Sequence, residues 1–247
     1  MKIGVSALAT DKIKFEDEIE YYANLGLDCV EILHDFPNDE FDLDILNSYD
    51  INYSIHSPFN DLNIASLDKH IRRTSINEVK SSIDLANKID AEVVVIHPGK
   101  ISYGARNYVD YVYELNDDAF KEIANYAHDA GVYPCFENMP DIEGFMYKDV
   151  NQLMNIIEEV DGYMTLDLGH AHTNNYKPEE LYFDRVKHIH VHDNDGSDDT
   201  HLTLNEGTFN LNNFFNLFEK KGYSDVYLLE LHSKESIKNS LDFINNL

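Results

Sequence analysis

Short apolar runs alternate with amphipathic segments along the whole chain. Eight runs rich in β-branched and aromatic residues predict strands at residues 2–8, 29–33, 51–55, 92–96, 132–136, 163–166, 186–192 and 226–229. Between them, apolar residues recur with a helical period, which predicts helices at 15–25, 42–49, 68–89, 116–130, 149–160, 178–183, 210–221 and 235–246. Residues 100–113 read as a tyrosine-rich connection.

The alternation of strand and helix predicts an α/β fold with a parallel sheet. Eight such units in 247 residues fit a (β/α)8 TIM barrel, which often forms one domain of this length. We therefore expect residues 1–247 to form a single barrel domain. The alternative is a doubly wound open sheet, but that fold usually has a glycine-rich turn after its first strand. Residues 7–10 here read Ala-Leu-Ala-Thr.

Side chains that can bind metal ions stand at the ends of six predicted strands. The run at 92–96, for example, is almost entirely β-branched and is followed at once by His97. Because parallel barrels place their active sites at the carboxyl ends of the strands, we expect these side chains to converge. They are His56, His97, Glu137, Asp167, His192 and Glu230.

The chemistry of these side chains favours a metal centre. Several carboxylates cannot all remain ionised in one buried site without compensating positive charge. Histidines and carboxylates without cysteine are typical ligands of Zn²⁺, Mn²⁺, Fe²⁺ or Co²⁺. Side chains alternate along a strand, so His97 should share an inward face with Val93 and Val95.

Other polar side chains near the strand ends give weaker signals. His188 and His190 share a face with His192 but lie deeper, which favours hydrogen-bonded histidines that support the site. Glu31 faces inward from the second strand and fits either substrate contact or a buried ion pair. His172 is a further candidate for substrate contact.

The remaining histidines and the basic side chains predict no further site. No spacing argument applies to four histidines, which we expect at the surface: His34, His70, His128 and His232. Lys100 and Arg106 are the candidates for binding a phosphate, although solvated surface charge is the commoner role of such side chains.

The net charge restricts the partners. The chain has 46 Asp and Glu against 19 Lys and Arg, a net charge of −27, which disfavours binding to nucleic acids and anionic membranes. No apolar run approaches the ~20 residues of a membrane span, and the amino terminus lacks the apolar core of a signal peptide. Cys29 and Cys135 lie inside predicted strands. We therefore expect a reduced cytoplasmic protein.

The chain resembles the xylose isomerase-like TIM barrels over essentially its whole length. That superfamily includes sugar and sugar-phosphate isomerases and epimerases, and also endonuclease IV. The resemblance is carried by residues 26–32, His56-Ser57-Pro58, His97-Pro98-Gly99, Glu137-Asn138, Asp167-Leu168-Gly169-His170, residues 190–195, Asp199-Thr200-His201 with Glu206-Gly207, and Glu230.

The resemblance implies one of two ligand sets. In the epimerase branch, the positions of Glu137, Asp167, His192 and Glu230 hold one divalent ion, and the two glutamates exchange protons with adjacent substrate carbons. In the endonuclease branch, nine ligands hold three zinc ions that hydrolyse a phosphodiester. The matching positions are His56, His97, Glu137, Asp167, His170, His192, Asp199, His201 and Glu230.

Two features favour the epimerase branch. The loops at 34–40 and 193–199 are acidic, whereas an endonuclease needs basic loops to bind DNA. Phe59 stands where the endonuclease pattern has tyrosine, and it joins Glu31 and His172 as a candidate for substrate contact. We therefore expect a metal-dependent isomerase or epimerase of a small carbohydrate or its phosphate, with one to three Zn²⁺ or Mn²⁺ ions per chain. A zinc phosphodiesterase related to abasic-site endonucleases is the alternative, and the oligomeric state is left open.

Overall fold

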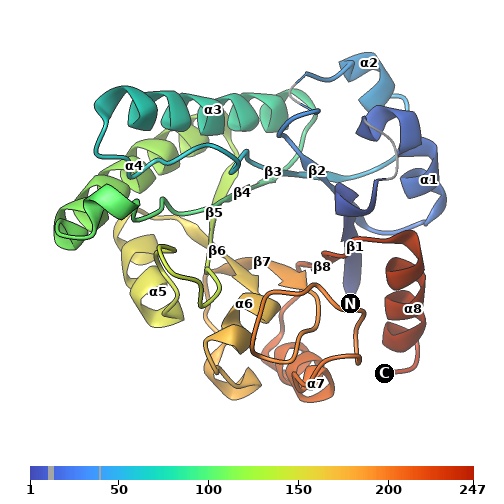
Figure 1. Ribbon diagram of the computed structural model, residues 1–247. Helices are drawn as coiled ribbons and strands as arrows, with labels where there is room; N and C mark the ends of the chain where they lie inside the picture. The colour runs from blue at the N-terminus through green and yellow to red at the C-terminus, as the bar shows by residue number, and fades with distance from the viewer. Residues whose placement is uncertain (11–13, 39) are drawn as a thin grey trace.

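The computed structural model describes residues 1–10, 14–38 and 40–247, so that Asp39 of the acidic loop lies outside the described residues. Eight parallel strands close into a barrel in chain order, with β1 paired to β8 (Figure 1). The strands are β1 (Lys2–Ser6), β2 (Cys29–Leu33), β3 (Tyr53–His56), β4 (Val93–Ile96), β5 (Tyr133–Glu137), β6 (Tyr163–Asp167), β7 (Val186–Val191) and β8 (Val226–Leu229). The predicted (β/α)8 barrel is confirmed.

Helices surround the strands as an outer ring (Figure 1). They are α1 (Ile19–Asn24), α2 (Leu43–Leu46), α3 (Lys69–Lys88), α4 (Val109–Ala130), α5 (Val150–Glu159), α6 (Leu168–Thr173), α7 (Leu211–Lys221) and α8 (Lys234–Ile244). Short 3-10 segments are η1 (Ala7–Ala9), η2 (Phe15–Glu18), η3 (Tyr103–Ala105) and η4 (Pro178–Glu180). In the described part of the chain, no helix has the length and apolar content needed to cross a membrane.

Four segments differ most clearly from the sequence pattern. Ala7–Ala9 form a 3-10 turn at the end of β1 instead of extending the strand. Helix α4 begins at Val109, inside the expected connection, because its first turns already bury Val112 against the core. Helix α6 follows β6 directly, since the Asp167 carboxylate caps it by accepting the backbone N–H of His170 at 2.7 Å. The helix expected at 178–183 is reduced to η4.

Side chains point alternately to the two faces of each strand, so that one set forms a core beneath the helices and the other set fills the barrel interior. Val94 and Ile96 of β4 belong to the main core, whereas Val93 and Val95 pack with Cys135 in a separate interior cluster. These are the two faces expected for this strand. The apolar interior is small, and the remaining lumen holds buried polar side chains instead of the branched apolar layers usual in such barrels.

Candidate metal centre

The carboxyl ends of five strands bring buried metal-ligating side chains to one end of the barrel. His56, Glu137 and Asp167 are the last residues of β3, β5 and β6, and each is at most 2 % exposed. Strand β7 contributes His190, and Glu230 follows β8 directly. This is the end at which parallel barrels place their active sites.

Four residues form the central group of the site, namely Glu137, Asp167, His190 and Glu230. Each offers a ligand atom within 4.8 Å of the others. Nδ1 of His190 lies 3.2 Å from Glu137 Oε1 and 3.3 Å from Glu230 Oε2. The same nitrogen lies 3.8 Å from Asp167 Oδ2. An imidazole nitrogen together with three carboxylates forms a set of ligands that suits a divalent cation.

The geometry groups His190, and not His192, with these three carboxylates, while His192 joins Asp167 in a neighbouring group. His192 was expected there, with His190 deeper and supporting. Instead His192 Nε2 lies 3.2 Å from Asp167 and 3.5 Å from Asp199. The strand register explains this placement, because Asp167 pairs with His190 across β6 and β7. His192 is two residues farther along, about 7 Å at the rise of a strand.

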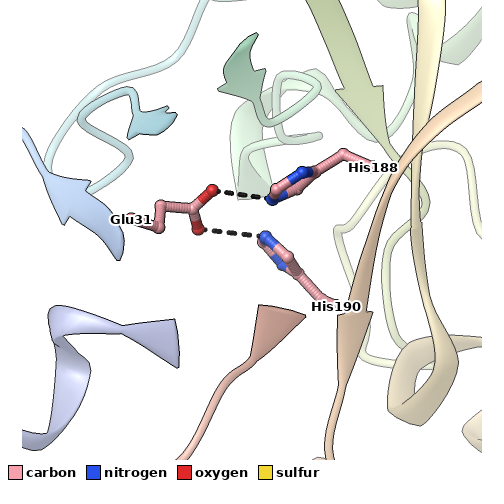
Figure 2. A group of neighbouring side chains, drawn as sticks. All are labelled: Glu31, His188 and His190. Carbon is pink, nitrogen blue, oxygen red and sulfur yellow. Dashed lines mark hydrogen bonds and ion pairs between the residues drawn. The ribbon is translucent and has the colours of Figure 1, made fainter. Parts of the chain in front are cut away.

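Glu31 orients His190 from deeper in the barrel. Figure 2 shows its carboxylate facing the rings of His188 and His190. Oε1 lies 3.0 Å from Nε2 of His190, and Oε2 lies 3.0 Å from Nε2 of His188. The Ser54 hydroxyl also donates to Oε2, at 2.9 Å. An ionised carboxylate only accepts, so Nε2 of both rings carries hydrogen. Nδ1 of His190 is then directed to the central group, as in a metal-binding histidine oriented by a carboxylate.

Opposite charges keep this pair ionised despite burial. Burial alone would raise the pKa of Glu31, but the imidazoles of His190 and His188 outweigh it and hold that pKa well below its usual range. Conversely, Glu230, Glu31 and Glu137 outweigh burial and raise the pKa of His190 well above its usual value. Without a cation, His190 is therefore an imidazolium whose second proton occupies the Nδ1 position at which a metal would bind.

A second group shares Glu137 with the central one. Glu137 Oε2 lies 2.9 Å from Nε2 of His97 and 3.6 Å from Nε2 of His56. The other ring nitrogen of His56 is 2.8 Å from the carbonyl oxygen of Ser57, which leaves Nε2 for the site. The three side chains offer ligand atoms within 4.8 Å of one another.

A third group lies between α6 and the loop after β7. Asp199 Oδ2 lies 3.1 Å from Nε2 of His170 and 3.4 Å from Nε2 of His201. His192 reaches both this group and Asp167. Although burial opposes it, the Asp199 carboxylate raises the pKa of His201 to about 9. Asp167 and Asp199 likewise outweigh burial and raise the pKa of His170 to about 10.

The loop at 193–209 is fixed by a buried carboxylate. Asp193 accepts the backbone N–H groups of Asn205 and Gly207, each at 3.0 Å. A Cβ on Gly207 would lie 2.2 Å from the Asp193 carboxylate, so only glycine fits this approach. His201 is held at a φ of +47°, and its Nδ1 lies 2.9 Å from the carbonyl oxygen of Glu230. Such a strained backbone persists only where its surroundings fix it.

Unsatisfied buried atoms support cation binding at this end of the barrel. Among the described residues, Asp167 Oδ2, Asp199 Oδ1 and both ring nitrogens of His192 are buried without a hydrogen-bond partner. Such atoms are costly to bury, and divalent cations would satisfy the carboxylate oxygens and one of the two ring nitrogens of His192. The donors are carboxylates and imidazoles without thiolate, so the residues fit Zn²⁺ or Mn²⁺.

A cavity of about 230 Å³ opens over the three groups. Its lining combines the metal-ligating side chains with apolar ones, a mixture typical of sites for small organic ligands. The ligating side chains are His56, His97, Glu137, His170, Asp199, His201 and Glu230. The apolar ones are Leu8, Leu33, Phe59, Met139, Pro140, Ile142 and Phe145.

The three side chains expected to contact substrate are placed differently. Phe59 lines the cavity, whereas Glu31 lies beneath it and His172 packs beside Phe209, with ring centroids 5.3 Å apart. Their substrate contacts stay predictions. His232 is exposed, as expected, and its side chain also lines the cavity. Its position two residues after Glu230 was the one sequence signal for this.

Another cavity, of about 290 Å³, opens at the opposite end of the barrel. It is lined by residues from the amino-terminal ends of the strands, including Lys2, Cys29 and Val226. Catalytic side chains are not expected at this end of a parallel barrel, which serves stability. We therefore assign the candidate site to the carboxyl end.

Comparisons with known proteins identify the family and agree with the fold. A family model described as xylose isomerase-like TIM barrel matches residues 19–247. The uncharacterized protein MJ1311 of Methanocaldococcus jannaschii is 30 % identical over 268 residues, which cover 99 % of this chain and 91 % of that protein. Fructoselysine 3-epimerase of Shigella flexneri is 24 % identical over 68 % of this chain and 63 % of the epimerase. The crystal structure of a D-tagatose 3-epimerase-like protein matches with a TM-score of 0.90 and 29 % identity, covering 100 % of this chain and 96 % of that one.

Substituting Glu31→Gln should weaken metal binding. The amide would present N–H hydrogens to one of the two histidine nitrogens that now face the carboxylate, which favours the wrong His190 tautomer. We expect the Zn²⁺ dissociation constant to rise by about 10- to 100-fold, as for other residues that orient metal-bound histidines. Chelator competition on the folded variant measures it.

A matched control for this variant is Glu122→Gln. Glu122 pairs with Arg73 and Lys80 outside the barrel, and its loss should leave the Zn²⁺ dissociation constant unchanged. Equal metal affinity in Glu31→Gln and the wild type would show that Glu31 does not orient His190.

Proposed function

The chain belongs to the family of xylose isomerase-like TIM barrels, and on that premise we propose that it is a metal-dependent isomerase or epimerase of a carbohydrate. One observation carries the proposal. Glu137 from β5 and Glu230 after β8 both lie close to Nδ1 of His190, at 3.2 and 3.3 Å. Two carboxylates at one point of a buried cavity are suited to removing and returning a proton.

Glu137 and Glu230 are the proposed proton-transfer residues. One glutamate removes the proton from the carbon beside the substrate carbonyl. The other returns a proton to the opposite face of that carbon in an epimerisation, or to the neighbouring carbon in an isomerisation. Burial would raise both pKa values, but His97 and His190 outweigh it at Glu137, as His190 does at Glu230. Both carboxylates are therefore ionised at neutral pH, so either can accept the proton from carbon, and the glutamate that returns a proton first takes one from a substrate hydroxyl or from water.

A divalent cation held by Glu137, Asp167, His190 and Glu230 would polarise the carbonyl and hydroxyl oxygens of the sugar and acidify the neighbouring C–H bond. The surrounding residues prepare the site for this chemistry. Glu31 orients His190, and the apolar side chains Phe59 and Phe145 restrict water at the cavity.

The names of the similar proteins agree with a carbohydrate substrate. They include a fructoselysine 3-epimerase and a D-tagatose 3-epimerase-like protein. The net charge of −27 disfavours a polyanionic substrate such as DNA. We therefore propose a small carbohydrate as the substrate.

A multinuclear phosphodiesterase is the second candidate. The observation that favours it is the pair of further ligand groups, one around His56 and His97 and one around Asp199 and His201. These groups adjoin the central one and would suit additional zinc ions.

Substituting either glutamate, Glu137→Gln or Glu230→Gln, should reduce turnover of ketose substrates by about 10²- to 10⁴-fold, the usual contribution of a general base. NMR in D₂O measures epimerisation together with deuterium uptake at the carbon beside the carbonyl. Metal content measured in parallel separates a lost base from a lost ligand. Glu143→Gln, an exposed ion-pairing residue, is the matched control. Wild-type rates in Glu137→Gln would contradict the proposal.

The two candidate functions differ in whether His201 is needed as a metal ligand for activity. An isomerase needs only the central cation, so His201→Ala should retain that cation and lose less than about tenfold in sugar turnover. Elemental analysis and a ketose assay measure both. Near three zinc ions per chain, together with cleavage of abasic duplex DNA that His201→Ala abolishes, would establish the phosphodiesterase instead.

A further inference from the structure

One basic side chain lies in the wall of the cavity over the metal-ligand groups. Lys100 follows β4, three residues beyond His97, and both residues line this cavity. Among the described lining residues, Lys100 is the only lysine or arginine. Arg106, the other candidate for binding a phosphate, is instead paired with Glu143 and does not line the cavity.

The backbone at Lys100 is held from both sides. The side chain of Asn63 accepts the N–H of Lys100 at 3.0 Å and donates to its carbonyl at 2.8 Å. Lys100 also forms an antiparallel bridge with Phe145. The preceding Gly99 passes so close to Ala65 that a Cβ there would lie 2.3 Å from the alanine methyl. The lysine stem therefore starts from a fixed point beside the cavity.

The ammonium group has an aromatic contact but no ion pair with a carboxylate in the described residues. Nζ lies 5.3 Å from the centroid of the Phe145 ring, which positions the cation by a cation–π contact. Other cations of these loops are neutralised, since Arg106 pairs with Glu143 at 2.6 Å and Lys148 with Asp141 at 2.8 Å. In a chain with 46 acidic and 19 basic side chains, an unpaired cation at the cavity is available to a ligand.

We propose that Lys100 binds an anionic group of the substrate, so that the enzyme acts on a sugar carrying a phosphate or a carboxylate and not on a neutral sugar. The inference rests on the proposed isomerase function. The reacting end of the sugar would lie at Glu137 and Glu230, and its charged end would lie at Lys100. A lysine ammonium is a compact charge that suits either anion, and the apolar Phe145 beside it lowers the local dielectric constant and strengthens the attraction.

Non-reacting analogues test this assignment without requiring turnover. Isothermal titration calorimetry of the metal-loaded full chain would compare ribitol 5-phosphate, ribonate and uncharged ribitol. We expect at least one anionic analogue to bind tenfold or more tightly than ribitol. Lys100→Met keeps the length of the side chain and should remove that preference, with the affinity for ribitol unchanged. Lys100→Arg should retain most of it.

Arg106→Met is the matched control, because it removes a cation of the same connection that is already paired with Glu143. It should leave the preference for the anionic analogue intact. Which analogue binds more tightly distinguishes a sugar phosphate from a sugar acid. The proposal is overturned if neither anionic analogue binds more tightly than ribitol, or if Lys100→Met keeps the preference. A Lys100-dependent preference without turnover of any sugar would instead contradict the isomerase function and leave the anion site in place.

Discussion

The carboxyl end of the barrel depends on charge compensation between buried carboxylates and imidazoles. His190 contacts carboxylates through both of its ring nitrogens. Its Nε2 lies 3.0 Å from Glu31, and its Nδ1 lies within 3.3 Å of Glu137 and Glu230. Removing one partner of such a buried pair leaves an uncompensated charge, which typically destabilises a protein by about 3–5 kcal/mol. A cation at Nδ1 would replace a proton there, so that metal binding and stability of the barrel are linked.

The ligands are held with different rigidity. Glu137, Asp167 and His190 belong to strands of a closed barrel, whose positions are fixed by hydrogen bonds to strands on both sides. Asp199 and His201 lie on a loop that depends on a network around one buried carboxylate and contains a strained backbone. The central group is thus the more rigid part of the site, which suits proton transfer at a defined carbon atom.

Local patterns predicted the barrel and most of the strand-end residues. The alternation of side chains identified the inward face of β7. It did not show which histidine lies level with the carboxylate of Asp167, because that depends on the register between β6 and β7, a long-range property. The sequence therefore could not tell which of His190 and His192 lies among Glu137, Asp167 and Glu230. The start of α4 was missed because aromatic and β-branched residues have low helix propensity, which burial of Val112 overrides. No periodicity indicates the direction of a loop side chain, so the places of His232 and Lys100 in the cavity required the structure.

The most direct test of the central group is a crystal structure of the Mn²⁺-loaded protein with anomalous diffraction measured at the manganese edge. The account predicts a manganese peak coordinated by Glu137, Asp167, Nδ1 of His190 and Glu230, with Nε2 of His190 still paired with Glu31. A peak bonded to His192 without His190, or no peak among these four side chains, would contradict it.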